Sequence, residues 1–278
     1  MTRRICIVAV LFGLACSRKE PPPPAKRTAP WPAREQPEAA PARSVTARFA
    51  VEPRAEVRFE LKAQTKTPRG VCRVARGELE IDLLDLARTR GTVSVDVASA
   101  SMEGDEVEQA REDTRRAHNW LDVGASRPEA ERDRLRWASF SFDNIEKPSA
   151  EAAHEGQLVK SGGADAGIAS DGGTEAAPAE VRAVTFSVRG QLLLHGFRVD
   201  QSAELRALFQ YAQPASPGAR PDRIVIQTRR PLVVSLKAHD IKPRDDTGVF
   251  VAQDAKLFGR EVGTSASVQL ALSARPAP

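Results

Sequence analysis

The side chains most able to do chemistry lie close together in H-D-I-K-P-R-D-D-T-G, which carries His239, Asp240, Arg244, Asp245 and Asp246. One imidazole and three carboxylates are ligands that divalent metal ions accept. The same segment is also typical of a solvated hairpin tip with a proline turn. Metal-binding loops need a tighter ligand pattern than this one. We therefore interpret the segment as a charged loop and predict no metal site, while its functional role stays open.

Two further reactive side chains stand alone. Cys72 has no second cysteine nearby, and the alternation in V-C-R-V-A-R predicts a small side chain on one face of a strand. His195 has no second histidine within metal-ligand spacing and no serine or cysteine partner, which favours a structural histidine that bonds a backbone group. The sequence shows no catalytic triad, carboxylate pair or cofactor fingerprint. We therefore predict a protein that is not an enzyme and needs no cofactor.

The first sixteen residues, M-T-R-R-I-C-I-V-A-V-L-F-G-L-A-C, have the order of a secretory signal. Arg3 and Arg4 precede an apolar run of about ten residues, which is too short for the roughly twenty that span a bilayer. We predict a signal peptide over residues 1–15. The cut before Cys16 resembles a bacterial lipobox, although Gly13 stands where a leucine is usual. The resemblance implies lipid attachment at Cys16, with secretion without lipid as the alternative.

This start predicts a lipid-anchored protein of the bacterial cell envelope that faces the periplasm. Ser17, where an aspartate often marks inner-membrane retention, gives a weak preference for the outer membrane. Residues 16–46 are rich in proline and poor in apolar side chains, which predicts a disordered, extended tether. A second low-complexity stretch, at about 148–180, predicts a disordered insert. Its glycines lack the strand, helix and Lys-Ser/Thr pair of a phosphate loop.

The charge balance excludes one large class of partners. The chain carries 41 basic and 37 acidic side chains, a net charge of +4, which falls to +2 without Arg3 and Arg4. Aromatic residues make up only 5% and are not interleaved with basic ones, as a stacking surface for bases requires. We therefore predict no nucleic-acid partner. The composition leaves the oligomeric state undetermined.

Residues 47–275 are predicted to form one domain. Apolar and polar residues alternate in segment after segment, which is the pattern of strands with one buried face. The clearest segments are 57–61, 79–83, 93–97, 140–142 and 184–188, followed by 192–194, 203–209, 224–228, 232–236 and 267–272. Many short strands at close spacing predict an all-β fold, a barrel or a sandwich.

One region has helical spacing instead. Asp105 followed by Glu108 matches a capping box, and a second short helix is predicted to begin near Pro128. The apolar residues that recur at helical spacing are Val107, Ala110, Ala117 and Leu121. Trp120, Leu121 and Trp137 are expected at one end of the sheet, either as packing residues or at the mouth of a ligand cavity.

The motif V-R-G-Q-L-L-L-H-G-F-R-V at 188–199 contains strand-Gly-x-Leu-x-Leu-His-Gly, a recurrent signature of the YceI-like family. Residues 77–97 are a second match, and the resemblance covers about 47–274. It implies an antiparallel lipocalin-like β-barrel with one or two short helices at one end. It also implies a long apolar interior that binds polyisoprenoid-type lipids. Phe197 and Arg198 replace the threonine and lysine that often follow the His-Gly pair, so the fold transfers more safely than the ligand.

The resemblance implies a protein that binds, stores or carries an isoprenoid- or quinone-like lipid. Apolar side chains alone would supply about 0.8 kcal/mol per buried methylene, so no charged anchor is needed. Polar contacts to a head group would come from His195 or Arg111, although Arg111 also fits a solvated helix face. The alternative is a non-catalytic envelope adaptor with a filled core and a protein-binding surface built from loops. The predicted cavity residues are Phe59, Leu61, Ile81, Val95, Val97, Trp120, Leu121, Phe142, Phe186, Val188, Leu192 and Leu194.

Overall fold

The computed structural model describes residues 44–63, 67–150, 178–245, 247, 249, 256–257 and 260–278. The predicted signal peptide, Cys16 and the predicted tether as far as residue 43 lie outside this part of the chain, as do residues 151–177 of the predicted insert. Both described ends of that insert are strand. Ser149 pairs with Thr185 and Glu180 pairs with Tyr211, so the predicted insert is too long at each end.

Strands make up most of the described chain. They are β1 (Thr46–Ala63), β2 (Arg69–Asp82), β3 (Arg90–Asp96), β4 (Ser101–Glu103), β5 (Trp137–Ala150), β6 (Glu180–Leu194), β7 (Phe197–Tyr211), β8 (Arg223–Thr228), β9 (Leu232–Ser235), β10 (Lys256–Leu257) and β11 (Arg260–Pro276). The helices are α1 (Val107–Trp120) and α2 (Glu129–Leu135), with single 3-10 turns at η1 (Leu86–Arg88), η2 (Val97–Ser99) and η3 (Lys237–His239). No helix among the described residues is long and apolar enough to cross a membrane.

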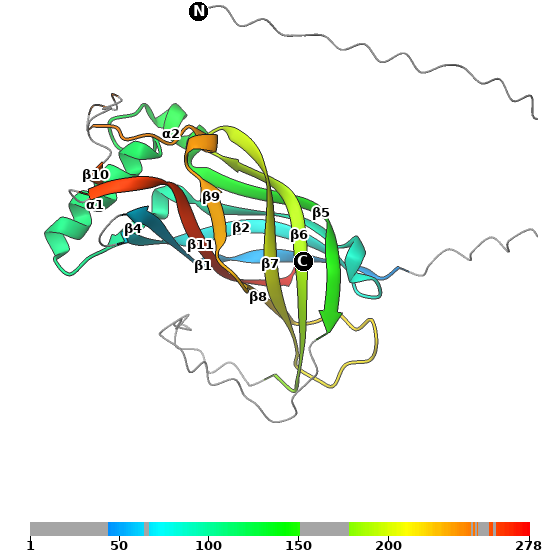
Figure 1. Cartoon of the computed structure of the whole chain (residues 1–278). Helices are drawn as coiled ribbons and strands as arrows, with labels where there is room; N and C mark the ends of the chain where they lie inside the picture. The colour runs from blue at the N-terminus through cyan, green and yellow to red at the C-terminus, as the bar shows by residue number, and fades with distance from the viewer. Residues whose placement is uncertain are drawn as a thin grey trace, which may run out of the picture. The chain divides into compact units, whose positions relative to one another are not determined.

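Eight strands close into a ring in the order β1-β11-β8-β7-β6-β5-β3-β2, because β1 pairs with both β11 and β2. Every pairing around this ring is antiparallel. β4 pairs with β2, while β9 and β10 pair with β11. Figure 1 shows the ring from the side, with the two helices at one end. The predicted all-β, lipocalin-like barrel is therefore confirmed.

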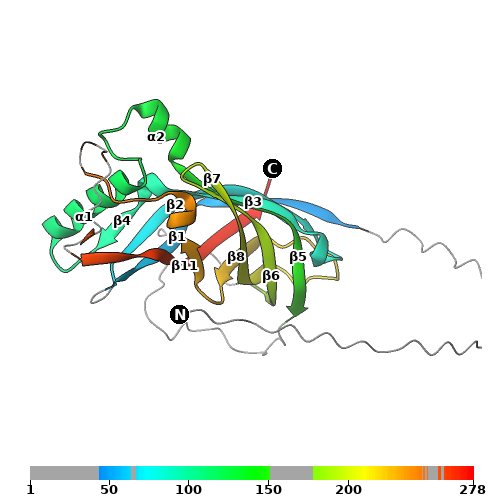
Figure 2. The same ribbon diagram turned by 45° about the horizontal axis from the view of Figure 1, so that its top comes forward.

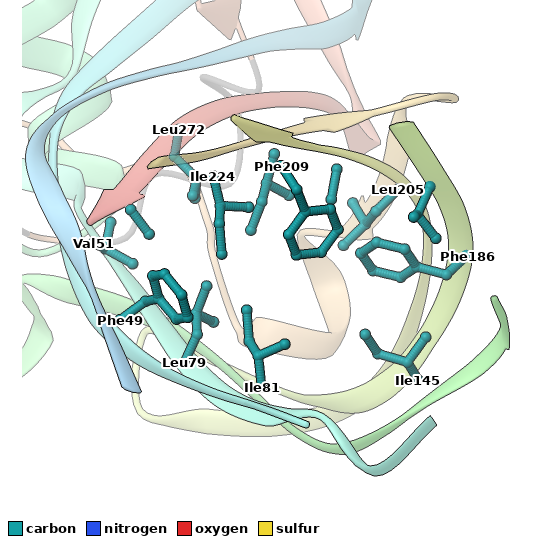
Figure 3. Packing of buried hydrophobic residues seen from close by; sticks show 14 of the residues in the cluster. Phe49, Val51, Leu79, Ile81, Ile145, Phe186, Leu205, Phe209, Ile224 and Leu272 are labelled. Carbon is teal, nitrogen blue, oxygen red and sulfur yellow. The ribbon is translucent and has the colours of Figure 1, made fainter. Parts of the chain in front are cut away.

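The period-two pattern decides which residues enter the barrel. On β7, Leu205, Ala207 and Phe209 are buried, and the residues between them are partly exposed. Inward side chains from opposite sides of the ring point toward one another (Figure 3). Successive side chains of a strand point to opposite faces, so each ring strand contributes alternate residues to one shared apolar interior.

Two glycines lie inside strands where neighbouring backbones approach closely. A Cβ atom at Gly77 would lie 2.2 Å from the carbonyl oxygen of Thr92, and one at Gly190 would lie 2.1 Å from that of Ser141. The β5–β6 register shifts next to Gly190, between Phe142 and Ile145. These glycines therefore permit close contact and an irregularity within the wall rather than ending strands.

The helices lie together at one end of the barrel, and Figure 2 shows them there from a second direction. Helix α2 follows Pro128, as predicted. The predicted capping box of α1 is wrong, because the N-cap is Glu106 and its side chain makes no capping hydrogen bond. Glu108 then stands at the second helical position instead of the third, which a capping box requires. Val107 is 66% exposed, so the apolar stripe does not include the first turn.

The two ends of the barrel are closed differently. At the end nearest η1, here called the plugged end, Phe49, Leu272 and Ala274 are 0% exposed and pack in one apolar cluster with Tyr211. At the opposite end, here called the capped end, a second apolar cluster joins α1 and the η3 segment to the strands. Its buried members are Leu61, Met102, Ala117, Trp120, Leu236, Ile241 and Ala266.

Trp137 does not join Trp120 and Leu121 at the capped end, and that prediction is wrong. It is the first residue of β5, where Ala138, Phe140 and Phe142 line the interior. Alternation therefore turns Trp137 outward, and its ring lies 3.8 Å from the guanidinium carbon of Arg76.

Candidate functional site

A cavity of about 260 Å³ occupies the barrel interior. Its wall extends from Trp120 and Ile241 at the capped end to Leu86 of η1. Leu272 of the plugged end also lines it, whereas Phe49 and Tyr211 of the same cluster do not. The interior is thus hollow over most of its length and solid at one end.

Most of the predicted cavity residues line this space. They are Phe59, Leu61, Ile81, Val95, Val97, Trp120, Leu121, Phe142, Phe186, Leu192 and Leu194. Val188 differs: it is 1% exposed in the core cluster and is not part of the cavity wall. Ile145, which lies opposite Val188 on β5, does line the cavity. Alternation identifies the inward face but cannot tell which inward residue lies behind a larger neighbour.

The cavity wall is almost pure hydrocarbon. None of the residues that line it is charged, and polar side-chain atoms come only from Cys72, Thr89, Thr228 and Trp120. Thr228 accepts a hydrogen bond from the backbone N–H of Leu270. Burial, aided by the negative charge of Asp96, raises the pKa of the Cys72 thiol to about 12. The thiol therefore stays protonated and serves as a small side chain on the buried face of β2, as predicted.

The capped end is fixed by a polar network outside the cavity. His195 and Gly196 are the central residues of the β6–β7 hairpin, with φ of 52° and 82°. Positive φ at both positions is the geometry of a type I′ turn. The Nε2 of His195 lies 2.8 Å from Asp122 Oδ2, and its Nδ1 lies 3.0 Å from the carbonyl oxygen of His239. Both ring nitrogens of His195 therefore face oxygen atoms within hydrogen-bond distance.

His195 therefore has the structural role that the sequence favoured, with a carboxylate partner in addition to the backbone. It does not line the cavity, and its side chain is 6% exposed. Asp122 holds the centre of the network. Its Oδ1 is 2.7 Å from Arg127 NH2 and 3.0 Å from Arg244 Nε. One carboxylate thus joins the segments that follow α1, precede α2 and follow η3 to the β6–β7 hairpin.

His239 is the second buried histidine of the capped end, at 1% exposure. Its Nδ1–H is shared between the carbonyl oxygens of Leu194 and Phe197, at 3.2 and 3.3 Å. Burial lowers the pKa of His239, and the positive charge of His195 adds to that effect. The neutral ring is therefore favoured, and it ties η3 to the two strand ends at the hairpin.

The other charged residues of the predicted loop face separate partners. Asp240 forms an ion pair with Lys242, and Asp245 Oδ1 accepts from the backbone N–H groups of Thr247 and Val249. Asp246 lies outside the described residues. Within the described chain, no group of three or more histidine, cysteine or acidic side chains is placed to hold a metal ion.

Arg111 lies on the outer surface of α1. Its NH1 is 2.8 Å from Glu108 Oε1, and its side chain is 72% exposed. It does not line the cavity. The structure therefore places both proposed head-group contacts, Arg111 and His195, outside the cavity wall.

Comparisons with known proteins give similarities among solved structures only. No family model and no curated protein matches the chain. The chain is similar to a polyisoprenoid-binding domain from Saccharophagus degradans implicated in plant cell wall breakdown, at 16% identity and a TM-score of 0.46. That similarity covers 82% of this chain and 98% of the other. The chain is also similar to BcnA of Burkholderia cenocepacia, at 14% identity and a TM-score of 0.46, over 79% of this chain and 95% of the other.

Sequence reasoning missed Asp122 and Arg127. Asp122 lies 73 positions from His195 and follows a helix, so nothing local marks it as a partner. Asp122 and His195 both adopt positive φ, at 56° and 52°. Aspartate and histidine are among the non-glycine residues that tolerate this region, but a sequence does not show where it is used.

Proposed function

We propose that this protein binds, stores or carries a long apolar lipid of the isoprenoid or quinone-like type inside its barrel. The observation that carries the proposal is the hollow interior, whose wall has no charged residue. An apolar cavity of about 150 Å³ stays dry and admits benzene. The cavity described here is larger, at about 260 Å³, and its wall is also apolar. Because such a wall offers water few hydrogen-bond partners, an apolar guest is favoured over water.

The cavity volume sets the length of the buried segment. Scaled from benzene in a cavity of about 150 Å³, it accommodates roughly ten carbons. At about 0.8 kcal/mol per methylene, that segment contributes on the order of 8 kcal/mol before the entropic cost of binding. A gross contribution of this size supports binding without a charged anchor. An isoprenoid longer than about ten carbons must keep its remainder outside the present cavity or move wall residues.

The cavity argues against the alternative of a non-catalytic adaptor, because that hypothesis required a filled core. A protein-binding surface built from the loop at His239–Asp245 is also less favoured. His239 is buried there, and Arg244 faces Asp122 at the capped end. Catalysis finds no support in the cavity either, because the thiol of Cys72 stays protonated.

Our proposal places the barrel in the bacterial cell envelope, facing the periplasm, with Cys16 as the lipid attachment site and the outer membrane weakly preferred. Its support is the N-terminal sequence, in which a positively charged start, a short apolar run and a cysteine follow in the order of a lipoprotein signal. Metabolic labelling of the full chain with a radioactive fatty acid tests this part. Label that is lost in a Cys16→Ser variant supports it, and an unlabelled parent protein overturns it.

Two measurements test the lipid-binding function on the purified protein. Organic extraction followed by mass spectrometry is expected to recover a co-purifying apolar lipid. N-phenyl-1-naphthylamine, an uncharged probe that fluoresces in apolar surroundings, is expected to bind the emptied barrel at one site. A protein that yields no lipid and takes up neither this probe nor added isoprenoids would contradict the proposal.

A matched pair of variants assigns binding to the cavity. Ala207 lines it from β7, while Ala183 on β6 lies outside the wall and pairs with the outward Leu208. Ala207→Phe places a ring in the cavity and is expected to weaken probe binding at least about ten-fold, the equivalent of losing a few buried methylenes. Ala183→Phe adds the same ring outside and is expected to leave binding unchanged. Equal effects from both variants would show that the probe binds elsewhere.

A further inference from the structure

The barrel wall has a seam between β7 and β9. β7 pairs with β8 from Leu205 to Gln210, and β8 ends at Thr228. Beyond that point β9 continues along β11, where its four residues pair with Ser265 to Val268. Both β7 and β9 are described over their whole length, and no backbone pairing joins them. Figure 1 shows the two strands bordering this side of the barrel.

Residues that should be interior reach solvent along this seam. In an antiparallel pair, directly opposite residues share a face of the sheet. Phe197 and Val199 lie opposite Leu194 and Leu192, which line the cavity. Phe197 is nevertheless 46% exposed, and Val199 is half-buried. On the paired half of the same strand, Leu205 is only 8% exposed.

The cavity lies directly behind the seam. Ala203 of β7 lines it from one side, and Leu232 and Val234 of β9 line it from the other. If the β7–β8 register continued, Gln201 would lie opposite Leu232, and both are half-buried. A backbone hydrogen bond from Arg229 to Glu204 closes one end of the seam, and the hydrogen bond from His239 to the Phe197 carbonyl closes the other. Between these two points no backbone pairing joins β7 to β9, so side chains separate the cavity from the outside there.

We propose that this seam is a lateral portal through which an apolar chain passes between a lipid bilayer and the cavity. The inference rests on the proposed lipid-binding function. Two large apolar side chains, Phe197 and Val233, are exposed beside the seam, at 46% and 56%. An apolar cargo is held in bilayers, and apolar side chains beside an opening can enter the bilayer surface.

The charges beside the seam suit an anionic bilayer. Arg198 follows Phe197, and Arg229 and Arg230 precede β9, all of them exposed. Glu204 faces Arg230 at 3.4 Å, and Asp200 is the other nearby acid on β7. Three basic side chains thus stand against two acidic ones, and the net charge beside the seam is positive. A positive net charge favours contact with anionic head groups. The cavity also holds roughly ten carbons, so a longer chain needs an exit such as this one.

The test separates loading from binding. Retinol, a fluorescent isoprenoid, is supplied from phosphatidylcholine vesicles that contain phosphatidylglycerol, and its transfer rate to the purified protein is followed. Phe197→Asp and Val233→Asp are expected to slow transfer on the order of ten-fold, because each removes an apolar contact with the bilayer. Binding of N-phenyl-1-naphthylamine from water is expected to stay unchanged. Val181→Asp, an exposed valine of β6 that pairs with Gln210 far from the seam, is the matched control.

The outcomes distinguish the two proposals. If the parent protein binds no naphthylamine probe, the lipid-binding function fails. If the parent binds the probe but Phe197→Asp and Val233→Asp transfer retinol at the parent rate, the portal is wrong. Slowing by Val181→Asp to the same extent would also overturn it, because the effect would not belong to the seam.

A cross-link gives a second, independent measurement. Gln201→Cys and Leu232→Cys place two thiols across the seam, where a flexible bismaleimide can join them. Cys72 is buried and does not compete. Joining the strands is expected to slow both the uptake and the release of retinol. Free exchange of retinol in the cross-linked protein would contradict the portal.

Discussion

The two ends of the barrel are closed by different kinds of interaction. At the plugged end, Phe49, Leu272 and Ala274 are fully buried in one apolar cluster continuous with the strands. At the capped end, a helix and a 3-10 turn cover the opening, and a carboxylate and two histidines hold them in place. Apolar packing is non-directional and tolerates no gap, whereas a polar network depends on a few specific partners.

The difference suggests that the ends have different tasks. The plugged end contains the strands' own long-range pairings and contributes to folding as a whole. The capped end is built from short segments held largely by side chains, so we expect it to loosen while the ring stays closed. In a barrel that holds a ligand, the capped end and the adjacent seam are where exchange is expected.

The largest effect is expected from Phe49→Ala at the plugged end. Removing a fully buried phenylalanine costs about 3–5 kcal/mol in the free energy of unfolding, through lost burial and the cavity left behind. Urea unfolding measures it, with the exposed Phe197→Ala as control at under about 1 kcal/mol. The release rate of bound naphthylamine probe is expected to stay close to that of the parent. Similar losses of stability from both substitutions would show that the plugged end is not the solid one.

Asp122→Asn tests the capped end and comes second. Asparagine keeps the size and tolerates the positive φ of 56°, but it removes the charge that faces His195, Arg127 and Arg244. Removing one partner of a buried pair costs about 3–5 kcal/mol, and the partial exposure of both arginines reduces our expectation to about 2–3. Probe release is expected to become faster, in contrast to Phe49→Ala.

The matched control is Asp240→Asn. Asp240 also has a positive φ, at 53°, but it is more exposed than Asp122 and forms an ion pair with Lys242. Stability and probe release are therefore expected to change little. If Asp122→Asn behaves like Asp240→Asn, the polar network does not hold the cap.

The sequence predicted the wall of the barrel better than its ends. Alternation in residues such as Val57, Phe59 and Leu61 reports a property of each strand alone, and it correctly identified the inward face. The hairpin at His195 and Gly196 was not predicted, although a His-Gly pair meets the φ requirements of its turn. Local chemistry was sufficient for the inward face of the strands.

The ends depend on partners that are distant in the chain. Asp122, His195 and Arg244 meet only once the ring has closed, and no local pattern connects them. Trp137 was expected with Trp120 and Leu121 at one end of the sheet, as a packing or mouth residue, but its position in β5 turns it outward. The seam was also invisible, because 232–236 alternates like any other strand and only the pairing shows that β9 lacks a neighbour on one side.

A smaller effect, from pH, distinguishes the same two regions. Burial lowers the pKa of His239 below its ordinary 6.5, so the unfolded chain binds a proton there at a higher pH than the folded protein does. Stability therefore falls as the pH drops below about 6.5 and is retained above it. Melting temperature against pH at constant ionic strength measures this, and His239→Gln is expected to flatten the curve in that range.

Two other groups, His118 and Glu52, also make stability depend on pH, and each can be distinguished from His239. Burial also lowers the pKa of His118, which bonds the carbonyl oxygen of Ala100, so His118→Gln controls for its share. Burial raises the pKa of Glu52, but hydrogen bonds from Ser273 and Arg275 outweigh that effect and lower it below 4.5. The stability that Glu52 contributes is therefore lost only at more acidic pH. An unchanged curve in His239→Gln would show that His239 does not bind the cap in its neutral form.

The smallest expected effect is a gain at the capped end. Glu106 occupies the N-cap of α1 in extended geometry, with φ −111° and ψ 127°, and makes no capping hydrogen bond. Aspartate in this geometry accepts from the backbone N–H of the second or third helical residue, so Glu106→Asp is expected to stabilise the protein by about 0.5–1 kcal/mol without changing its charge. Glu106→Gln is the control, since it changes the charge but supplies no cap. If the capped end limits ligand release, Glu106→Asp also slows release of the naphthylamine probe. A gain in stability with no change in release would instead assign exchange to the seam alone, because the helix would then be stronger while the route for the ligand stayed the same.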